Sequence, residues 1–442
     1  MPCAPDPDHP TRVMKTSAEY SPFPVDSLCR SPTQKQKSKF KEIAAEVLSS
    51  NKVACLLLGG GQGTRLGYDK CKGSYVLDNK RGWSLFDYII NRGKTQGCSS
   101  WWIMTSPMNH DETLAYFEAK DYYGLGADSF NFFSQGVLPC LSASSSSNPT
   151  DYKVILSSPS SVAFAPDGNG GIYNSLFSSG MLKKMKKEGV VSVHCFSVDN
   201  VLVKPADPTF IGFCMSIGAD VGNKVLWKVS PEEKIGVMAK DSNGKSCVVE
   251  YSDMCDADKN LRDKSGGLVY GAGNVCNHFY TLEFLERLLG SEGGVDSAVT
   301  YHIAKKKIPY FDGNKVVKPE TPNGIKLETF IFDVFPLSNK MAVLEVQREE
   351  EFAPIKNKDD PSGKVVVADS PTMAKEMICA LSKRWILSQA KKKKKKVKAA
   401  LDKLEYCEVA PTISYEGEGI TSEMVEEVLK RQGDGEVSVV FE

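Results

Sequence analysis

An apolar run opens directly into glycines at Leu56-Leu-Leu-Gly-Gly-Gly-Gln-Gly-Thr-Arg-Leu-Gly67. Residues 53–58 are apolar and bounded by glycine, which predicts a short buried β-strand. Glycine tolerates backbone conformations that a Cβ would forbid, so the N–H groups after this strand can crowd around an anionic or planar ligand. The glycines that give this freedom are Gly59, Gly60, Gly61 and Gly63.

Two familiar phosphate-binding motifs fail on their spacing here. A P-loop needs a glycine, four residues and then Gly-Lys-Ser/Thr, and no glycine of this loop leads to that pair. A dinucleotide fingerprint needs Gly-x-Gly-x-x-Gly, but Gly61-x-Gly63 is followed by Leu66, and the next glycine comes one place late at Gly67. The loop instead carries Arg65 and precedes Lys72, which suits the binding of a nucleoside triphosphate.

Composition limits the partners and the compartment that we expect. The 442 residues exceed one typical domain, and 41% hydrophobic with 25% charged residues is ordinary for a soluble globular protein. Lys+Arg and Asp+Glu are both 55, so no net field would attract nucleic acid or a membrane surface. The apolar runs are strand-sized, and the start shows neither a basic nor an apolar targeting segment. The 13 cysteines form no C-x-x-C pair, which favours reduced thiols and a cytoplasmic location.

The chain is expected to divide into residues 1–50, 51–360 and 361–442. The first segment is rich in Pro, Ser and Asp up to about residue 33, which predicts loose order, and becomes helical at 33–50. Strand-like and helical segments alternate in the second, with strands at 100–105 and 190–196 and helices at 111–119 and 280–289. This alternation predicts an α/β domain with a central, mostly parallel sheet that binds ligands at the carboxyl ends of its strands. A boundary at 359–363 precedes a smaller C-terminal domain.

Two stretches of biased composition are expected at the surface. The serine-rich segment at 142–147 precedes an Asn-Pro pair and is typical of an exposed loop. The run Lys391–Lys396 invites a nucleic-acid interpretation, but its flanks are apolar and no aromatic residues are interleaved with it. We therefore expect it to be the solvated part of a helix or a surface loop.

Two further motifs sit beside predicted strands. Pro166-Asp-Gly-Asn-Gly-Gly171 precedes apolar residues at near-helical spacing, which Gly180 interrupts. Such a turn either binds an anion or a sugar hydroxyl at the start of a helix or is an ordinary capped turn, and both interpretations stay open. Asp199 follows the strand-like run 194–198 and is well placed for Mg²⁺, which prefers carboxylate and phosphate oxygens, although aspartate also ends strands for structural reasons.

Many motifs of this chain occur in the order found in one known family. They are Leu58–Gly67, Lys72-Gly73, Phe132–Gly136, Pro166–Gly171, Val198–Asn200, Glu250–Ser252, Gly273-Asn274, Pro322–Lys326, Arg348–Phe352, Lys356-Asn357 and Ile413–Gly419. Together they closely resemble the eukaryotic UDP-N-acetylhexosamine pyrophosphorylases, also called UDP-N-acetylglucosamine diphosphorylases. The chain departs from the family pattern at Gly59, where alanine is common, and at Cys71, which replaces the usual proline.

The resemblance implies a Rossmann-like nucleotidyltransferase fold and a definite reaction. UTP and N-acetylglucosamine 1-phosphate would give UDP-N-acetylglucosamine and pyrophosphate, with Mg²⁺ as cofactor and Mn²⁺ as an alternative ion. The implied catalytic cations are Arg65, Lys72, Lys326 and Lys356, with Asp199 as the metal ligand. The implied nucleotide-binding residues are Leu58, Gly59, Gly60, Gly61, Gln135 and Gly168, of which Gln135 would read uracil. The implied sugar-binding residues are Asn169, Glu250, Tyr251 and Asn274.

Three functions remain as alternatives at this point. The first is the N-acetylhexosamine-specific uridylyltransferase, with UTP and an N-acetylhexosamine 1-phosphate as its ligands and no nucleic acid, membrane or obligate protein partner. The second is a UDP-glucose or broad UDP-sugar pyrophosphorylase, which would use a glycine loop of the same kind. The third is a non-catalytic homologue that binds UDP-sugar. The presence of all the implied catalytic cations and of Asp199 argues against this third alternative.

Overall fold

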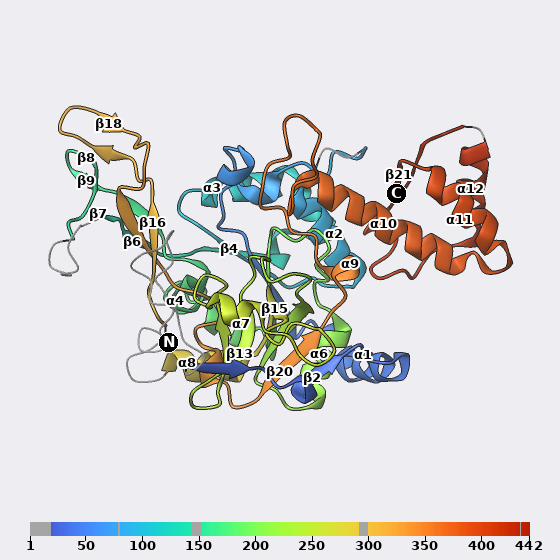
Figure 1. The fold of residues 1–442 in the computed structure, drawn as a ribbon, viewed down its shortest axis with the longest axis horizontal. Coiled ribbons are helices and arrows are strands. Elements are labelled where there is room, and N and C mark those ends of the chain that lie inside the picture. The colour runs from blue at the N-terminus through green and yellow to red at the C-terminus, as the bar shows by residue number, and fades with distance from the viewer. Residues whose placement is uncertain (1–18, 78–79, 143–151, 291–298, 434) are drawn as a thin grey trace.

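The core of the protein is an 11-stranded sheet, seen in a computed structural model that describes all residues except 1–18, 78–79, 143–151, 291–298 and 434 (Figure 1). Along its main path the order is β2-β20-β12-β15-β11-β3-β4-β5, and β15 alone runs antiparallel to its neighbours. The strands are β2 (Leu28–Arg30), β3 (Val53–Leu58), β4 (Trp101–Thr105), β5 (Phe130–Ser134), β11 (Ser192–Ser197), β12 (Val221–Trp227), β15 (Ala272–Thr281) and β20 (Met341–Glu345). The predicted α/β class with a mostly parallel sheet is confirmed.

Helices cover both faces of the sheet, and the sequence of β3 explains why. All six of its residues are buried, because alternate side chains enter two different cores. Leu56 and Leu58 pack in the cluster with α4 (Ile172–Ser178) and α8 (Leu282–Gly290), whereas Leu57 packs in the cluster with α2 (Leu85–Thr95) and α3 (His110–Ala119). A strand buried on both faces reads as a continuous apolar run, which is what the sequence shows.

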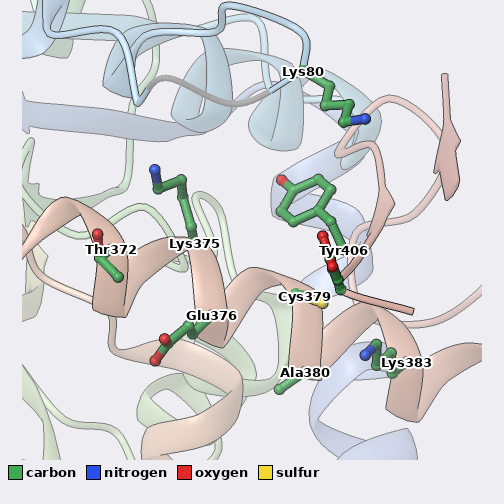
Figure 2. A pocket seen from close by; sticks show the side chains of 9 residues that line it. Lys80, Thr372, Lys375, Glu376, Cys379, Ala380, Lys383 and Tyr406 are labelled. Atoms are coloured by element: carbon green, nitrogen blue, oxygen red, sulfur yellow. The ribbon is translucent and has the colours of Figure 1, made fainter. Parts of the chain in front are cut away.

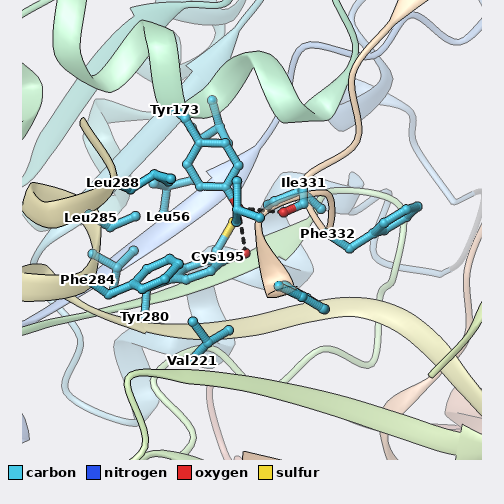
Figure 3. Packing of buried hydrophobic residues seen from close by; sticks show 14 of the residues in the cluster. Leu56, Tyr173, Cys195, Val221, Tyr280, Phe284, Leu285, Leu288, Ile331 and Phe332 are labelled. Atoms are coloured by element: carbon cyan, nitrogen blue, oxygen red, sulfur yellow. Dashed lines mark hydrogen bonds between the residues drawn. The ribbon is translucent and has the colours of Figure 1, made fainter. Parts of the chain in front are cut away.

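Two tyrosines anchor the 329–332 segment to the core that contains Leu56 and Leu58 (Figure 3). The hydroxyl of Tyr173 donates to the carbonyl of Ile331 and lies 3.0 Å from the hydroxyl of Tyr280. All three residues are almost completely buried. Because a buried hydroxyl needs a partner, this contact fixes the 329–332 segment against α4 and β15.

Most predicted elements are confirmed with small shifts. Helix α1 (Gln34–Ser49) begins at a capping box in which the Thr33 side chain accepts from Gln36, and β4, β11 and α3 match their predicted ranges within two residues. Gly180, with φ +76°, separates α4 from α5 (Met181–Lys187), as its interruption of the pattern indicated. The helix predicted at 280–289 starts later, because Tyr280 and Thr281 still pair as the end of β15.

The expectation of loose order up to residue 33 is wrong for residues 20–30. Strand β1 (Tyr20–Pro22) pairs with β13 (Val237–Asp241), and β2 pairs in parallel with β20. Tyr20 and Leu28 are buried by this pairing. Ladder hydrogen bonds and this burial outweigh the polar composition. Residues 1–18 and the serine-rich positions 143–147 lie outside the described part of the chain.

A ribbon of short strands projects from the sheet at the upper left of Figure 1. It contains β6 (Val137–Pro139), β7 (Leu141–Ser142), β8 (Leu156–Ser158), β9 (Ser161–Val162), β10 (Phe164–Pro166), β16 (His302–Lys306), β17 (Tyr310–Phe311), β18 (Val316–Val317) and β19 (Gly324–Glu328). The remaining elements near the sheet are α6 (Pro208–Ser216), α7 (Asp256–Asn260), α9 (Arg348–Glu351) and β14 (Ser246–Val249).

The C-terminal residues pack around a hydrophobic cluster of their own (orange to red in Figure 1). Their elements are α10 (Pro371–Gln389), α11 (Lys394–Lys403), β21 (Tyr406–Val409), α12 (Ser422–Gly433) and β22 (Ser438–Phe441). The lysine run forms a short turn and the start of α11 with exposed side chains, so its expected solvation is confirmed. Across the described ranges, no helix is both long and apolar enough to cross a bilayer.

A buried ion-pair network ties three parts of the fold together. Lys224 on β12 has a side chain only 1% exposed, and its Nζ lies 2.6 Å from Glu351 Oε2 and also contacts Asp207. Lys204 Nζ lies 3.3 Å from the other Glu351 oxygen. Burial raises the pKa of Glu351, but the neighbouring Lys204 and Lys224 lower it by more than burial raises it. The net pKa is below its usual value, so the carboxylate stays charged. The network therefore fixes α9 against β12.

Lys224→Met is expected to lower the free energy of unfolding by about 3–5 kcal/mol, because it leaves two buried carboxylates with one cation fewer. Denaturant unfolding followed by fluorescence measures the change. Lys398→Met is the control, since its ion pair with Asp402 is exposed and should be worth no more than about 0.5 kcal/mol. Equal effects of the two substitutions would contradict a structural role for the network.

Candidate active site

A cavity of about 370 Å³ opens where β11, β15 and the glycine loop meet. Its volume lies within the ~300–1,000 Å³ that small-molecule sites occupy. Both the strand that precedes Asp199 and the start of β15 reach this edge of the sheet. The lining residues are Arg65, Asn169, Ser197, Asp199, Lys234, Ile235, Gly236, Glu250, Asn274, Val275, Cys276, Phe330, Ile331, Phe332, Phe352 and Lys356. Six of the residues singled out in the sequence therefore share one cavity.

The cavity has a cationic end organised around one carboxylate. Lys72 Nζ lies 3.6 Å from Asp199 Oδ2, and both side chains are less than one-fifth exposed. Burial lowers the pKa of Lys72, and the charges of Lys356 and Arg65 lower it further. The carboxylate of Asp199 raises this pKa, but by less than the other effects lower it. Burial raises the pKa of Asp199, but Lys72 and Lys356 outweigh this and hold it below its usual range. Three cations around one carboxylate leave an excess of positive charge that suits a polyanionic ligand.

Backbone contacts explain why Lys356 meets Asp199 despite their separation in sequence. The N–H of Ile355 donates to the carbonyl of Asp199 at 2.9 Å. The side chain of Asn200 donates to the carbonyl of Glu351 at 2.7 Å and accepts from the N–H of Ala353 at 2.9 Å. Asn200 is 4% exposed, so these bonds are shielded from water. They fix the turn after β11 to the segment that carries Lys356, whose Nζ also lies 3.5 Å from Asp369 Oδ2.

Two residues at the start of α3, the preceding Asn109 and Glu112 in the first turn, hold the glycine loop in place, a role that the sequence analysis missed. Asn109 is 2% exposed, and its Nδ2 donates to the carbonyls of Gly59 and Gly61 at 3.0 and 3.4 Å. Glu112 accepts from the N–H of Cys71 at 2.8 Å, directly before Lys72. The sequence did contain a signal for Asn109, because it is a polar residue shortly after the end of a predicted strand. Both ends of the loop that carries Arg65 and Lys72 are therefore braced.

Most of the residues expected to bind the nucleotide lie where β3 and β5 end, outside the lining of this cavity. The N–H of Gly59 donates to Met104 at 2.7 Å, and the N–H of Gln135 donates to Thr105 at 2.9 Å. A Cβ on Gly60 would lie 2.4 Å from Gln135 Oε1, so only glycine allows this approach. Of the remaining members, Leu58 ends β3 and Gly61 lies in the loop after it, whereas Gly168 follows β10 and directly precedes Asn169.

Gly168 begins a turn that holds the 329–331 segment at one side of the cavity. It has φ +89°, and a Cβ there would lie 2.3 Å from the carbonyl of Thr329. Asn169 Oδ1 accepts from the N–H of Ile331 at 3.0 Å, and Asn274 Oδ1 accepts from the N–H of Cys276 at 3.2 Å. The amide nitrogen of Asn169 donates to Cys276 Sγ over a long 4.0 Å contact, and the amide nitrogen of Asn274 can donate to a ligand beside the aromatic wall formed by 330–332.

Lys326 and Tyr251 do not line the cavity either, in addition to Lys72 and the nucleotide-binding set. Lys326 lies on β19 in the projecting ribbon, close to Cys140. Burial raises the pKa of the Cys140 thiol, and the charge of Lys326 offsets part of that rise. Tyr251 follows Glu250 in a turn, but only Glu250 reaches the cavity. Conversely, Lys234, Ser197 and Cys276 line it and carried no sequence signal.

The donor set around Asp199 fits a magnesium ion that arrives with phosphate. The described residues contain no group of three or more His, Cys, Asp or Glu side chains that could hold a metal by themselves. Mg²⁺ retains water and is commonly held by one or two carboxylates together with substrate phosphates. A single hard carboxylate at the edge of a cationic cavity matches that pattern.

A second cavity of about 510 Å³ lies between the C-terminal elements and the loop that carries Lys80. Figure 2 shows side chains of α10 on one side of it and Lys80 on another. Lys80 donates to Ser438 at 2.6 Å, and Lys383 donates to the carbonyl of Leu404 at 2.6 Å. None of the expected site residues lines this cavity, so it is separate from the strand ends.

Comparisons with known proteins identify relatives of this chain over most of its length. The sequence profile of the UTP–glucose-1-phosphate uridylyltransferase family matches residues 12–410. A human UDP-N-acetylhexosamine pyrophosphorylase-like protein 1 is 38% identical over 91% of this chain and 81% of its own length. The UDP-N-acetylglucosamine pyrophosphorylase of Saccharomyces cerevisiae is 35% identical over 95% of this chain and 85% of its own length. The crystal structure of the Trypanosoma brucei uridine diphosphate N-acetylglucosamine pyrophosphorylase superposes with a TM-score of 0.81 at 25% identity, covering 96% and 86% of the two chains.

Proposed function

Since this chain belongs to the UTP–glucose-1-phosphate uridylyltransferase family, and within it to the UDP-N-acetylhexosamine pyrophosphorylases, we propose that it joins UTP to N-acetylglucosamine 1-phosphate. A bond forms between a phosphate oxygen of the sugar phosphate and the α-phosphorus of UTP. The bond from that phosphorus to the bridging oxygen breaks, and pyrophosphate leaves with the electron pair. The products are UDP-N-acetylglucosamine and pyrophosphate.

The single observation that carries this proposal is the cationic cluster around Asp199. Two anions repel each other, so the transfer needs positioning and positive charge more than covalent chemistry. Lys72 and Arg65 are proposed to hold the triphosphate, and Lys356 to neutralise the sugar phosphate. Asp199 would hold Mg²⁺, which supplies charge neutralisation to phosphate oxygens when bound. The proposed cations lie around one cavity edge.

The remaining binding roles follow from neighbouring groups. Gln135 and the loop Leu58–Gly61, with Gly168, are proposed to hold the uridine, and Asn169, Glu250 and Asn274 to hold the sugar. Lys326 and Tyr251 are proposed as contacts in the bound state only, because each lies a few residues from a lining residue. We also propose a cytosolic location, which is supported by the free state of the twelve cysteines in the described residues.

N-acetylglucosamine 1-phosphate is expected to be used with a kcat/KM at least about tenfold above that for glucose 1-phosphate, because lost amide contacts leave protein polar groups unpaired at ~1–3 kcal/mol each. The N-acetyl group needs donors and room, which Asn274 and the wall at 330–332 offer. N-acetylgalactosamine 1-phosphate, which differs at one hydroxyl, is expected to be a second substrate. Pyrophosphate release at saturating UTP and Mg²⁺ measures all three.

Two outcomes of this assay would redirect the assignment. Equal or better use of glucose 1-phosphate would replace the proposed substrate by a broader range of sugars. The absence of pyrophosphate release with every sugar, while UTP still binds, would favour a non-catalytic UDP-sugar-binding protein.

A further inference from the structure

The amide of Gln135 is held in one orientation by a carboxylate that the proposed mechanism does not use. Gln135 Nε2 lies 3.2 Å from Asp167 Oδ1 and 3.5 Å from the carbonyl of Gly168. Its Oε1 faces the opposite way, against Gly60. The residue is 7% exposed, so water competes little for these contacts. The amide nitrogen therefore points toward Asp167 and the amide oxygen toward the glycine loop.

The fold makes a specific place for this carboxylate. A Cβ on Gly171 would lie 2.1 Å from Asp167 Oδ1, and a Cβ on Gly136 would lie 2.6 Å from Oδ2. The main chain of Asp167 is held as well, because its carbonyl accepts from the N–H of Thr329 at 2.7 Å. The carboxylate thus sits between two glycines that leave it room, with Gln135 as its side-chain partner.

A carboxylate can only accept hydrogen bonds, so it distinguishes the two ends of an amide. Turning the Gln135 amide over would bring its oxygen against the oxygen of Asp167 and lose the Nε2 contact. An asparagine or serine at this position would accept either end, because those side chains both donate and accept. The choice of aspartate therefore fixes which end of the amide is presented as donor and which as acceptor.

We propose that Asp167 is a positioning residue that makes the nucleotide site select uracil over cytosine. The inference rests on the proposed function, in which Gln135 faces the base. Uracil offers a donor at N3 and an acceptor at O4, which match Gln135 Oε1 and the Nε2 hydrogen that does not bond Asp167. The contact of Nε2 with the Gly168 carbonyl is 3.5 Å long, so O4 can replace it at a weak hydrogen bond's cost. Cytosine offers an acceptor at N3 and a donor at its amino group, and it would require the amide to turn over. Asp167 opposes that turn.

The test compares UTP with CTP in wild type and in Asp167→Asn, by kcat/KM and by equilibrium binding of each nucleotide. We expect the UTP-to-CTP ratio to fall at least about tenfold in the variant, because one matched hydrogen-bond pair is no longer enforced. Asp256→Asn, at a carboxylate with an 88% exposed side chain, is the matched control and should leave the ratio unchanged. Asp167→Ser serves the same purpose if the asparagine variant does not fold.

The outcomes separate this inference from the proposed function. An unchanged ratio in Asp167→Asn, even with slower turnover of both nucleotides, would overturn the role of Asp167 and leave the reaction intact. A wild type that binds UTP and CTP equally would overturn it too. If wild type binds UTP selectively but releases no pyrophosphate, the proposed reaction fails, and the binding ratios still decide the role of Asp167.

Discussion

Lys72→Ala is expected to lower kcat/KM by roughly 10²–10³-fold, the typical loss when one preorganised group that stabilises developing charge is removed. Its ammonium lies 3.6 Å from Asp199, the carboxylate that lines the cationic edge of the cavity together with Arg65 and Lys356. The effect should appear in kcat more than in KM, because the charge is needed most as pyrophosphate leaves. Pyrophosphate release at several UTP concentrations measures both constants.

The matched control is Lys70→Ala, which removes an exposed lysine from the same loop. It should retain nearly full activity, and both variants should keep the thermal midpoint of wild type. The pH profile gives a second readout, since Lys72 lowers the pKa of Asp199 and its loss lets that pKa rise. The acidic limb of the rate profile should therefore move to higher pH. Near-normal turnover in Lys72→Ala would remove Lys72 from the proposed mechanism.

The parts of the fold that the sequence predicted correctly are those with strong local signals. The apolar residues 53–58 lie between polar and glycine boundaries, and Thr33 with Gln36 forms the capping box that starts α1. Strands β1 and β2 have three residues each, too few to show a period. They exist because β13 and β20, far along the chain, supply their hydrogen-bond partners. Such pairing leaves no trace in local composition.

The site shows the same division between local and distant causes. Arg65 was singled out because it lies in the glycine loop after β3, and Asp199 because it follows the end of a strand, where ligands bind in α/β sheets. The contact between Asp199 and the segment carrying Lys356 depends on Asn200, and spacing alone could not reveal it. Asn109 bonds to the backbone and Asp167 to another side chain, so the sequence assigned neither a role, although Asp167 lies in the Pro166–Gly171 motif. Lys326 shows the opposite case: it belongs to a family motif, but it does not line the cavity.

Asp199→Ala is expected to reduce turnover by orders of magnitude, and Mg²⁺ at ordinary concentrations should not restore it. Asp199 is the proposed metal ligand, and the described residues hold no other cluster that could take over the ion. A single carboxylate binds Mg²⁺ weakly, so most of the affinity must come from the phosphates of UTP. Chelation with EDTA should therefore abolish wild-type activity reversibly, and activity should return when Mg²⁺ or Mn²⁺ is added.

The loss at Asp199 has two separable causes, because the carboxylate also neutralises Lys72 at 3.6 Å. Asp199→Asn keeps the size of the side chain and one oxygen but removes the charge, so it should bind UTP in the absence of metal at least as well as wild type. Its Mg²⁺ requirement should rise well above that of wild type, as measured by the ion concentration giving half-maximal rate. An unchanged Mg²⁺ requirement would mean that Asp199 serves only to position Lys72. Full wild-type activity in the presence of EDTA would rule out a divalent ion altogether.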